Sequence, residues 1–144
     1  MSADRPGARF AGALNQAENG PTFERMSMTL PHPTPDQISL PLVLSVLGDP
    51  TRLAIVAHLA RREGGKGRMS CSRFLALGSK TNLSYHLAKL REAGVTRTEA
   101  VGTQRFLTLR RDDLDQRFPG LLDSIVAGAE HAGLPKLEDT LEVA

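Results

Sequence analysis

The sequence predicts a mainly α-helical domain that carries one small β-hairpin, and three observations support this prediction. Apolar residues recur at helical spacing in the segments 51–63 and 80–93. Directly after Gly94, the pattern changes to two short strand-like runs around a glycine-containing turn. The charge is uneven, because residues 36–111 carry 13 basic and 5 acidic side chains whereas residues 112–144 carry 2 and 8. A basic middle of this kind favours an anionic partner such as nucleic acid.

We divide the 144 residues into three segments. Residues 1–35 are expected to form a flexible leader, because they mix Gly, Pro, Asn and Ser without a period and end in a Pro-x-Pro-x-Pro stretch. Residues 36–132 are expected to form one folded domain, and residues 133–144 an acidic tail. Two methionines late in the leader are alternative start sites, so whether residues 1–27 belong to the native protein stays open.

The first helix should begin near Pro41, which a first helical turn tolerates, and end at Leu47. It is apolar nearly all round, and such a helix is normally buried. In so small a domain, a second subunit is expected to supply some of its cover. The next helix should span residues 51–63, with Asp49 or Thr51 as its cap.

A basic, glycine-rich loop at residues 64–67 separates these helices from the next pair. A short helix is expected over residues 70–77, and a longer one over residues 80–93. Ser79 is a natural N-cap for the longer helix, and Gly94 is a natural terminator.

The strands of the hairpin are expected over residues 95–100 and 105–109. A last helix should follow over residues 112–132, with a break at Pro119-Gly120 as the alternative. Its apolar stripe consists of Leu121, Leu122, Ile125, Val126 and Ala129.

The helix over residues 80–93 has two distinct faces. Leu83, Leu87 and Leu90 fall close together on a helical wheel and mark the buried side. The first half of the opposite side carries hydroxyl, amide, phenol and lysine groups, which hydrogen-bond to base edges and phosphates. An ordinary surface helix is also polar outside, so this helix alone does not decide between DNA recognition and simple solvation.

The order of the elements adds to this argument. A helix, a short turn, a helix with a polar start and then a hairpin form a winged helix-turn-helix. In such a fold the second helix enters the major groove, and the wing lies along the backbone or the minor groove. Further basic side chains expected to extend the phosphate contact are Arg52, Lys66, Arg68 and Arg73.

Three segments resemble the ArsR/SmtB family of bacterial winged-helix repressors. Residues 47–56, which read LGDPTRLAIV, are similar to the family's opening L-x-D-P-T-R-L-x-I-L. Residues 79–95, which read SKTNLSYHLAKLREAGV, are similar to its recognition segment S-x-x-x-[IL]-S-x-H-L-x-x-L-x-x-A-G-[LV]. Residues 102–106, which read GTQRF, resemble the family's wing pattern G-[RT]-x-x-[YF]. The match spans roughly residues 38–126.

The resemblance implies a cytoplasmic homodimer, joined through its first and last helices, that represses a palindromic operator until an unknown effector releases it. The resemblance and the exposed face of the helix over residues 80–93 together select the side chains expected to contact DNA. These are Lys80, Thr81, Asn82, Ser84, Tyr85 and Lys89 in the helix, with Arg97 and Arg105 in the wing. An alternative is a winged-helix module that binds proteins without specific DNA binding.

The metal-ligand motifs of the family are not retained, so we expect neither a metal nor a cofactor. Cys71 lies near the position of a family Cys-x-Cys, but serines flank it. The last helix reads Asp113-Leu114-Asp115, which lacks the histidine of the family's Asp-x-His, and His131 does not have the family's spacing. A metal bound across a dimer by His131, Glu130 and the aspartates is a minor alternative.

Cys71 is also a candidate redox switch. Arg73 and a nearby helix N-terminus are expected to lower its pKa and favour the thiolate. The alternative is a small core residue without a switching role.

We expect no catalytic residues. Cys71 and His86 are the only conventional nucleophile–base pair, but they lie on different helices, and His86 borders the buried face, where packing or backbone bonding is its expected role. The chain has neither a glycine-rich phosphate loop nor a serine elbow.

No segment approaches the roughly 20 apolar residues of a membrane span. A single cysteine fits a reducing compartment.

Overall fold

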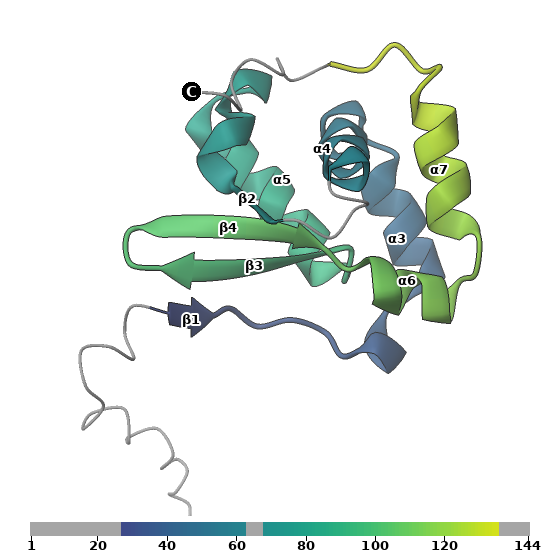
Figure 1. The fold of residues 1–144 in the computed structure, drawn as a ribbon, viewed down its shortest axis with the longest axis horizontal. Coiled ribbons are helices and arrows are strands. Elements are labelled where there is room, and N and C mark those ends of the chain that lie inside the picture. Colours follow the sequence, from purple (N-terminus) through teal and green to yellow (C-terminus); the bar gives the residue numbers. More distant parts are fainter. Residues whose placement is uncertain (1–26, 63–67, 136–144) are drawn as a thin grey trace, which may run out of the picture.

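The computed structural model describes residues 27–62 and 68–135 (Figure 1). Its elements, in chain order, are β1 (Ser27–Thr29), the 3-10 helix η2 (Pro35–Gln37), α3 (Leu40–Leu47), α4 (Pro50–Arg61), β2 (Arg68–Ser70), the 3-10 helix η4 (Cys71–Leu77), α5 (Lys80–Glu92), β3 (Thr96–Val101), β4 (Gln104–Leu109), α6 (Arg111–Arg117) and α7 (Leu121–Ala129). The helices α4 and α5 lie over one side of the β3–β4 hairpin, which extends from the helical body as a wing (Figure 1). The predicted fold class, mainly helical with a small hairpin in a winged helix-turn-helix, is confirmed.

Capping residues define where the helices start. The Ser39 hydroxyl accepts a hydrogen bond from the Leu42 amide at 3.4 Å, and Pro41 sits in the first turn of α3. The Asp49 carboxylate accepts from the Arg52 amide at 3.0 Å and begins α4. The Ser79 hydroxyl accepts from the Asn82 amide at 3.1 Å at the start of α5, as the sequence predicts.

The helix α3 differs from its expected burial. Val43, Val46 and Leu47 are buried, but Leu42 and Leu44 are 44% and 48% exposed. The sequence shows a helix that is apolar nearly all round, whereas one copy of this chain covers only one side of it. The other side is an apolar surface open to solvent.

The turn after α5 admits only glycine. Gly94 has φ +83°, and a Cβ built on it would lie 2.6 Å from Cγ1 of Ile38. Both the left-handed backbone and this close approach exclude a side chain. The turn lets the chain reverse into β3, and Ile38 closes the core beneath it.

Four strands form an antiparallel sheet in the order β1-β3-β4-β2. The hairpin pairs Thr96 with Leu109 and Val101 with Gln104. The sequence analysis missed the two edge strands, because each has three residues and forms only by pairing with the hairpin. The strand β2 pairs Met69 with Leu107, and both side chains are buried.

The strand β1 changes the expected boundary of the folded domain. The sequence analysis assigns residues 1–35 to a flexible leader, but residues 27–29 pair with the far end of β3. His32 continues this attachment, because its Nε2 accepts a hydrogen bond from the Thr98 amide at 2.9 Å. Residues 1–26 lie outside the described part of the chain, as do residues 136–144 of the expected acidic tail.

The last helix is broken, which was the alternative for residues 112–132. The segment splits into α6 and α7, and Gly120 at φ +83° turns the chain between them. Arg117 fastens α6 to the start of the domain by donating from Nη2 to the Ile38 carbonyl oxygen at 2.7 Å. The helix α7 packs against α4.

No single helix in the described ranges is long and apolar enough to cross a membrane. Only α3 and α4 taken together reach that length and composition, and they are bent by 102° at their junction.

The hydrogen bond from the Thr98 amide to His32 makes the free energy of unfolding depend on pH. Burial, with a smaller contribution from the nearby Arg97, holds its pKa below the ordinary 6.5. The neutral ring accepts the Thr98 hydrogen bond and the protonated ring cannot, so the stabilisation is present above pH 6.5 and is lost as the pH falls below it. Urea unfolding should therefore show a smaller loss of stability between about pH 7.5 and about pH 5 in His32→Gln than in the wild type. His131→Gln, at an exposed position, is the control and should follow the wild type.

Candidate nucleic-acid interface

The helix α5 presents the polar face that the sequence predicts. Leu83, Leu87 and Leu90 are buried, and they orient the helix. Five of the six side chains expected to contact DNA from this helix are exposed, namely Lys80, Thr81, Asn82, Ser84 and Tyr85. Tyr85 is 56% exposed, which is unusual for so large a side chain, and places a phenol at the centre of this face.

The sixth side chain, Lys89, is half-buried and engaged locally. Its Nζ lies 5.4 Å from the centre of the Tyr85 ring and 3.9 Å from Oε1 of Glu92. A cation–π contact at an exposed site contributes about 0.5–1 kcal/mol, so it favours this orientation of the tyrosine.

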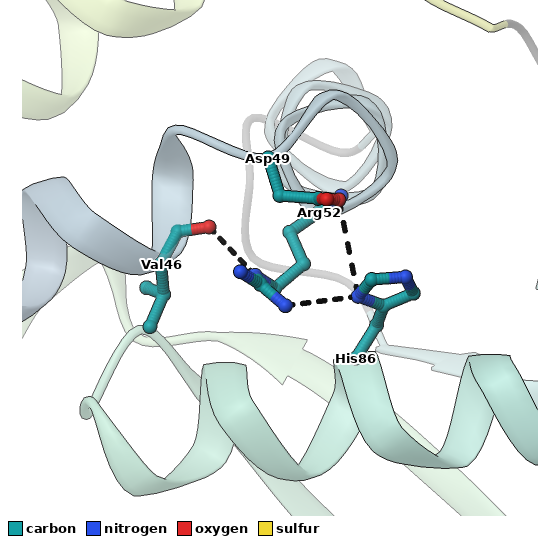
Figure 2. A network of polar contacts seen from close by, with 4 residues as sticks. All are labelled: Val46, Asp49, Arg52 and His86. Atoms are coloured by element: carbon teal, nitrogen blue, oxygen red, sulfur yellow. Dashed lines mark hydrogen bonds and ion pairs between the residues drawn. The ribbon is translucent and has the colours of Figure 1, made fainter.

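A network of polar contacts fixes α5 against α3 and α4 (Figure 2). The guanidinium of Arg52 donates from Nε to the Val46 carbonyl oxygen at 2.7 Å and from Nη1 to Nδ1 of His86 at 2.9 Å. A guanidinium only donates, so Nδ1 of His86 is the unprotonated ring nitrogen. The Asp49 carboxylate lies 3.8 Å from the same nitrogen, beyond hydrogen-bonding distance.

This network corrects two expectations. Arg52 offers a phosphate less than expected, because Nε and Nη1 of its guanidinium already donate to acceptors inside the protein. His86 neither bonds the backbone nor only packs, but accepts a side-chain hydrogen bond from a helix 34 residues earlier. The sequence contained both partners, but nothing in it indicated that they meet.

The wing separates its two arginines. Residues that pair across β3 and β4 point to the same side of the sheet. Arg105 pairs with Ala100, on the side that also carries Leu107 and faces α5. Arg97 pairs with Thr108, on the opposite side. Both arginines are exposed, but they cannot contact the same ligand group.

The remaining basic candidates are less available than the sequence suggested. Arg68 lies on the far side of the wing, where its Nη1 donates to Glu99 at 3.2 Å and its guanidinium stacks 4.3 Å from the centre of the Phe106 ring. Arg73 is half-buried. Lys66 lies outside the described residues.

A cleft that the sequence analysis did not foresee lies between α5, η4 and the wing. It has a volume of about 680 Å³, and its walls include Lys80, Ser84 and Arg105 from the expected contact set. The sequence could not indicate it, because three separate elements form it.

Cys71 lines this cleft, and its environment contradicts the thiolate argument. Burial raises the pKa of the thiol to about 11, and Arg105 only partly opposes this effect. Arg73, which was expected to lower the pKa, does not contribute. The thiol is therefore protonated at neutral pH, which opposes its use as a reactive switch.

The acidic side chains of the last helices are engaged in ion pairs. Asp113 accepts from Nε of Arg110 at 2.9 Å, and Asp123 accepts from Nη1 of Arg111 at 2.9 Å. Within residues 27–62 and 68–135, no three His, Cys, Asp or Glu side chains are grouped so that they could hold a metal ion.

Two known proteins and one family model are similar to this chain in sequence. Residues 47–99, from the end of α3 into β3, match the family model of a helix-turn-helix domain. The HTH-type transcriptional regulator YceK of Bacillus subtilis (strain 168) is 34% identical over 88 residues, which cover 58% of this chain and 82% of the relative. The HTH-type transcriptional regulator KmtR of Mycobacterium tuberculosis is 37% identical over 107 residues, which cover 72% of this chain and 75% of the relative. The chain belongs to the helix-turn-helix transcriptional regulators.

This membership establishes the function at a general level. The regulator binds DNA to control transcription, and its family is not enzymatic, which confirms the sequence-based exclusion of catalysis. The matched residues 47–99 include α4, η4 and α5, together with the whole Arg52 network except Val46.

Disruption of the network should loosen the recognition helix. Arg52→Ala leaves the Val46 carbonyl and the His86 ring without their donor. We expect a loss of about 1–3 kcal/mol in the free energy of unfolding, measured by urea denaturation. Arg61→Ala is the matched control, because the pair that Arg61 makes with Glu130 at 3.6 Å is solvent-exposed and its loss should change stability by less than about 0.5 kcal/mol. Equal stability of the two variants would contradict the role of the network.

Proposed function

We propose that this regulator is a cytoplasmic homodimeric repressor of the ArsR/SmtB type, which binds a palindromic operator and leaves it when an effector binds. The proposal rests on the two sides of α5: three leucines on one side are buried, and five polar side chains on the other side are exposed. The segments 47–56 and 79–95, which resemble that family, coincide with the start of α4 and with α5.

The first half of α5 would enter the major groove. Asn82, Ser84 and Tyr85 supply the donors and acceptors that read base edges, and Lys80 supplies a charge for a phosphate. Thr81 lies beside them on the exposed face. The ring of Tyr85, held by Lys89, reduces the entropy lost on binding, because its position is already restrained.

The wing arginines would have separate roles. Arg105 lies on the side of the hairpin that faces α5, so it would contact the backbone next to the major groove that the helix reads. Arg97 lies on the other side, so it would reach a different phosphate. Loss of one should therefore not be compensated by the other.

The dimer would form through α3 and α7. The exposed leucines of α3 form an apolar surface that a single copy leaves uncovered, and Ile125 and Val126 of α7 are only partly buried. The helix α7 lies at the end of the molecule opposite the turn of the wing (Figure 1). A two-fold dimer through this end would leave both recognition helices free to meet two half-sites of an inverted repeat.

DNA recognition is tested with a duplex selected from a random pool. Tyr85→Ala should weaken binding to that duplex by about 1–3 kcal/mol and leave binding to random DNA nearly unchanged, because a base contact is lost. Arg105→Ala should weaken both and reduce the slope of log K against log salt by about 1.

Fluorescence anisotropy at several salt concentrations measures both effects, with Gln116→Ala, exposed on α6, as the control. Equal affinity of the wild type for selected and random duplexes would contradict specific recognition. Binding that does not depend on salt, or no binding at all, would instead favour a protein-interaction module.

Assembly is tested separately from DNA binding. The double variant Leu42→Glu/Leu44→Glu places two charges on the exposed apolar side of α3 and should convert the dimer to a monomer in analytical ultracentrifugation. Leu75→Glu is the control, because Leu75 is similarly exposed, at 43%, but lies on η4. A monomeric wild type, or dissociation of the control as well, would contradict an interface through α3.

A further inference from the structure

The cleft between α5, η4 and the wing has the composition of a ligand site. Its volume of about 680 Å³ falls within the roughly 300–1,000 Å³ of small-molecule sites. Its walls are formed by Ser70, Cys71, Ser72, Leu75, Lys80, Leu83, Ser84, Leu87, Ala88, Arg91, Thr98, Thr103, Gln104 and Arg105. These side chains belong to elements that are far apart in the sequence, so the cleft exists only in the folded chain.

The charge on the walls has one sign. Lys80, Arg91 and Arg105 are basic, and none of the described residues that line the cleft is acidic. Hydroxyl groups supply further hydrogen-bond partners, whereas Leu75, Leu83 and other aliphatic side chains supply an apolar part. Cations, hydroxyls and apolar surface together suit an organic anion with an apolar body.

Two polar atoms of the wall have no hydrogen-bond partner among the described residues. The hydroxyl of Thr98 is inaccessible, and this residue is only 2% exposed, yet its Oγ1 makes no hydrogen bond. Nε of Arg91 is likewise buried and unpaired. Buried polar atoms normally have partners, so a ligand in the cleft that hydrogen-bonds to these two atoms would satisfy them.

A DNA phosphate explains this cleft less well than a small anion. The duplex backbone would reach the exposed side chains of Lys80 and Arg105, whereas Thr98 is buried on the side of the sheet that faces the helices. An apolar wall also contributes nothing to a phosphodiester. A small molecule can enter and satisfy the deep groups.

We propose that this cleft binds a small organic anion with an apolar body, and that its occupation opposes DNA binding. The regulatory part rests on the proposed function, since Lys80, Ser84 and Arg105 belong to both the cleft and the expected DNA surface. Arg91 and Thr98, which belong to the cleft but not to the expected DNA surface, contribute further hydrogen-bonding groups to the anion. The effector of the regulator would thus compete with the operator for the recognition helix and the wing.

Cys71 allows the site to be tested without DNA, because it is the single cysteine of the chain and lines the cleft. The probe is 8-anilino-1-naphthalenesulfonate, and its uncharged relative N-phenyl-1-naphthylamine is the ligand control. The rate of Cys71 alkylation by iodoacetamide is measured at about pH 9, where the high pKa still leaves some thiolate. The sulfonate should slow alkylation several-fold in a saturable manner, and the uncharged relative should not.

Paired variants locate the bound anion. Arg91→Gln should raise the sulfonate concentration needed for protection by roughly tenfold or more, and Arg61→Gln, on α4, should not. Thr98→Val should raise it by a smaller factor. Thr96→Val is its control, because Thr96 lies on the same side of β3 and also has a buried, unpaired hydroxyl but does not line the cleft. Equal effects within either pair, or equal protection by the uncharged compound, would overturn the site.

The regulatory part is tested with a duplex selected from a random pool. The sulfonate should raise the apparent Kd of the wild type for this duplex, and Arg91→Gln should need a higher concentration for the same effect. Protection of Cys71 without any change in DNA affinity would overturn the competition. Protection by the duplex but not by the sulfonate would assign the cleft to DNA alone and overturn the proposal. If no duplex binds and the sulfonate still protects Cys71, the anion site stands and the proposed function fails.

Discussion

The guanidinium of Arg52 holds together three helices, including the helix that we propose to read DNA. It joins the last turn of α3, through the Val46 carbonyl, to His86 in the middle of α5, while its own backbone lies in the first turn of α4. Three helices therefore share one polar junction, and the angle of the recognition helix is set by hydrogen bonds as well as by packing. A guanidinium suits this position because its planar donors point in fixed directions and keep their charge.

The helix α5 has one side that faces the core and one side that faces solvent. Its leucines pack inward against α4 and the sheet, so the same 3.6-residue period that buries them sets the polar side chains outward. The wing extends this outer surface on the side of Arg105 only, since Arg97 faces the other way. The cleft lies where the helix and the wing meet, so a small ligand there would act directly on the surface that we propose to contact DNA.

Local patterns in the sequence predicted the elements of this fold well. Periodicity and capping placed α4, α5 and the hairpin, and the caps Asp49 and Ser79 are observed. The strands β1 and β2 were missed because a three-residue edge strand has no period of its own and forms only on an existing partner. The pairing of residues 27–29 and His32 with β3 was not predicted for the same reason: these contacts are non-local.

The sequence by itself determined which side chains α5 exposes, because helical periodicity and leucine burial follow from neighbours in the chain. Only the tertiary structure decided what surrounds a residue. It showed Arg52 inside a network, Cys71 as a partly buried thiol with a raised pKa, and the wing arginines on opposite sides. The cleft, with the unpaired hydroxyl of Thr98, was likewise visible only in the tertiary structure. The physical reason is common to all of them: burial, pKa and ligand space depend on groups distant in sequence, and no local pattern records their approach.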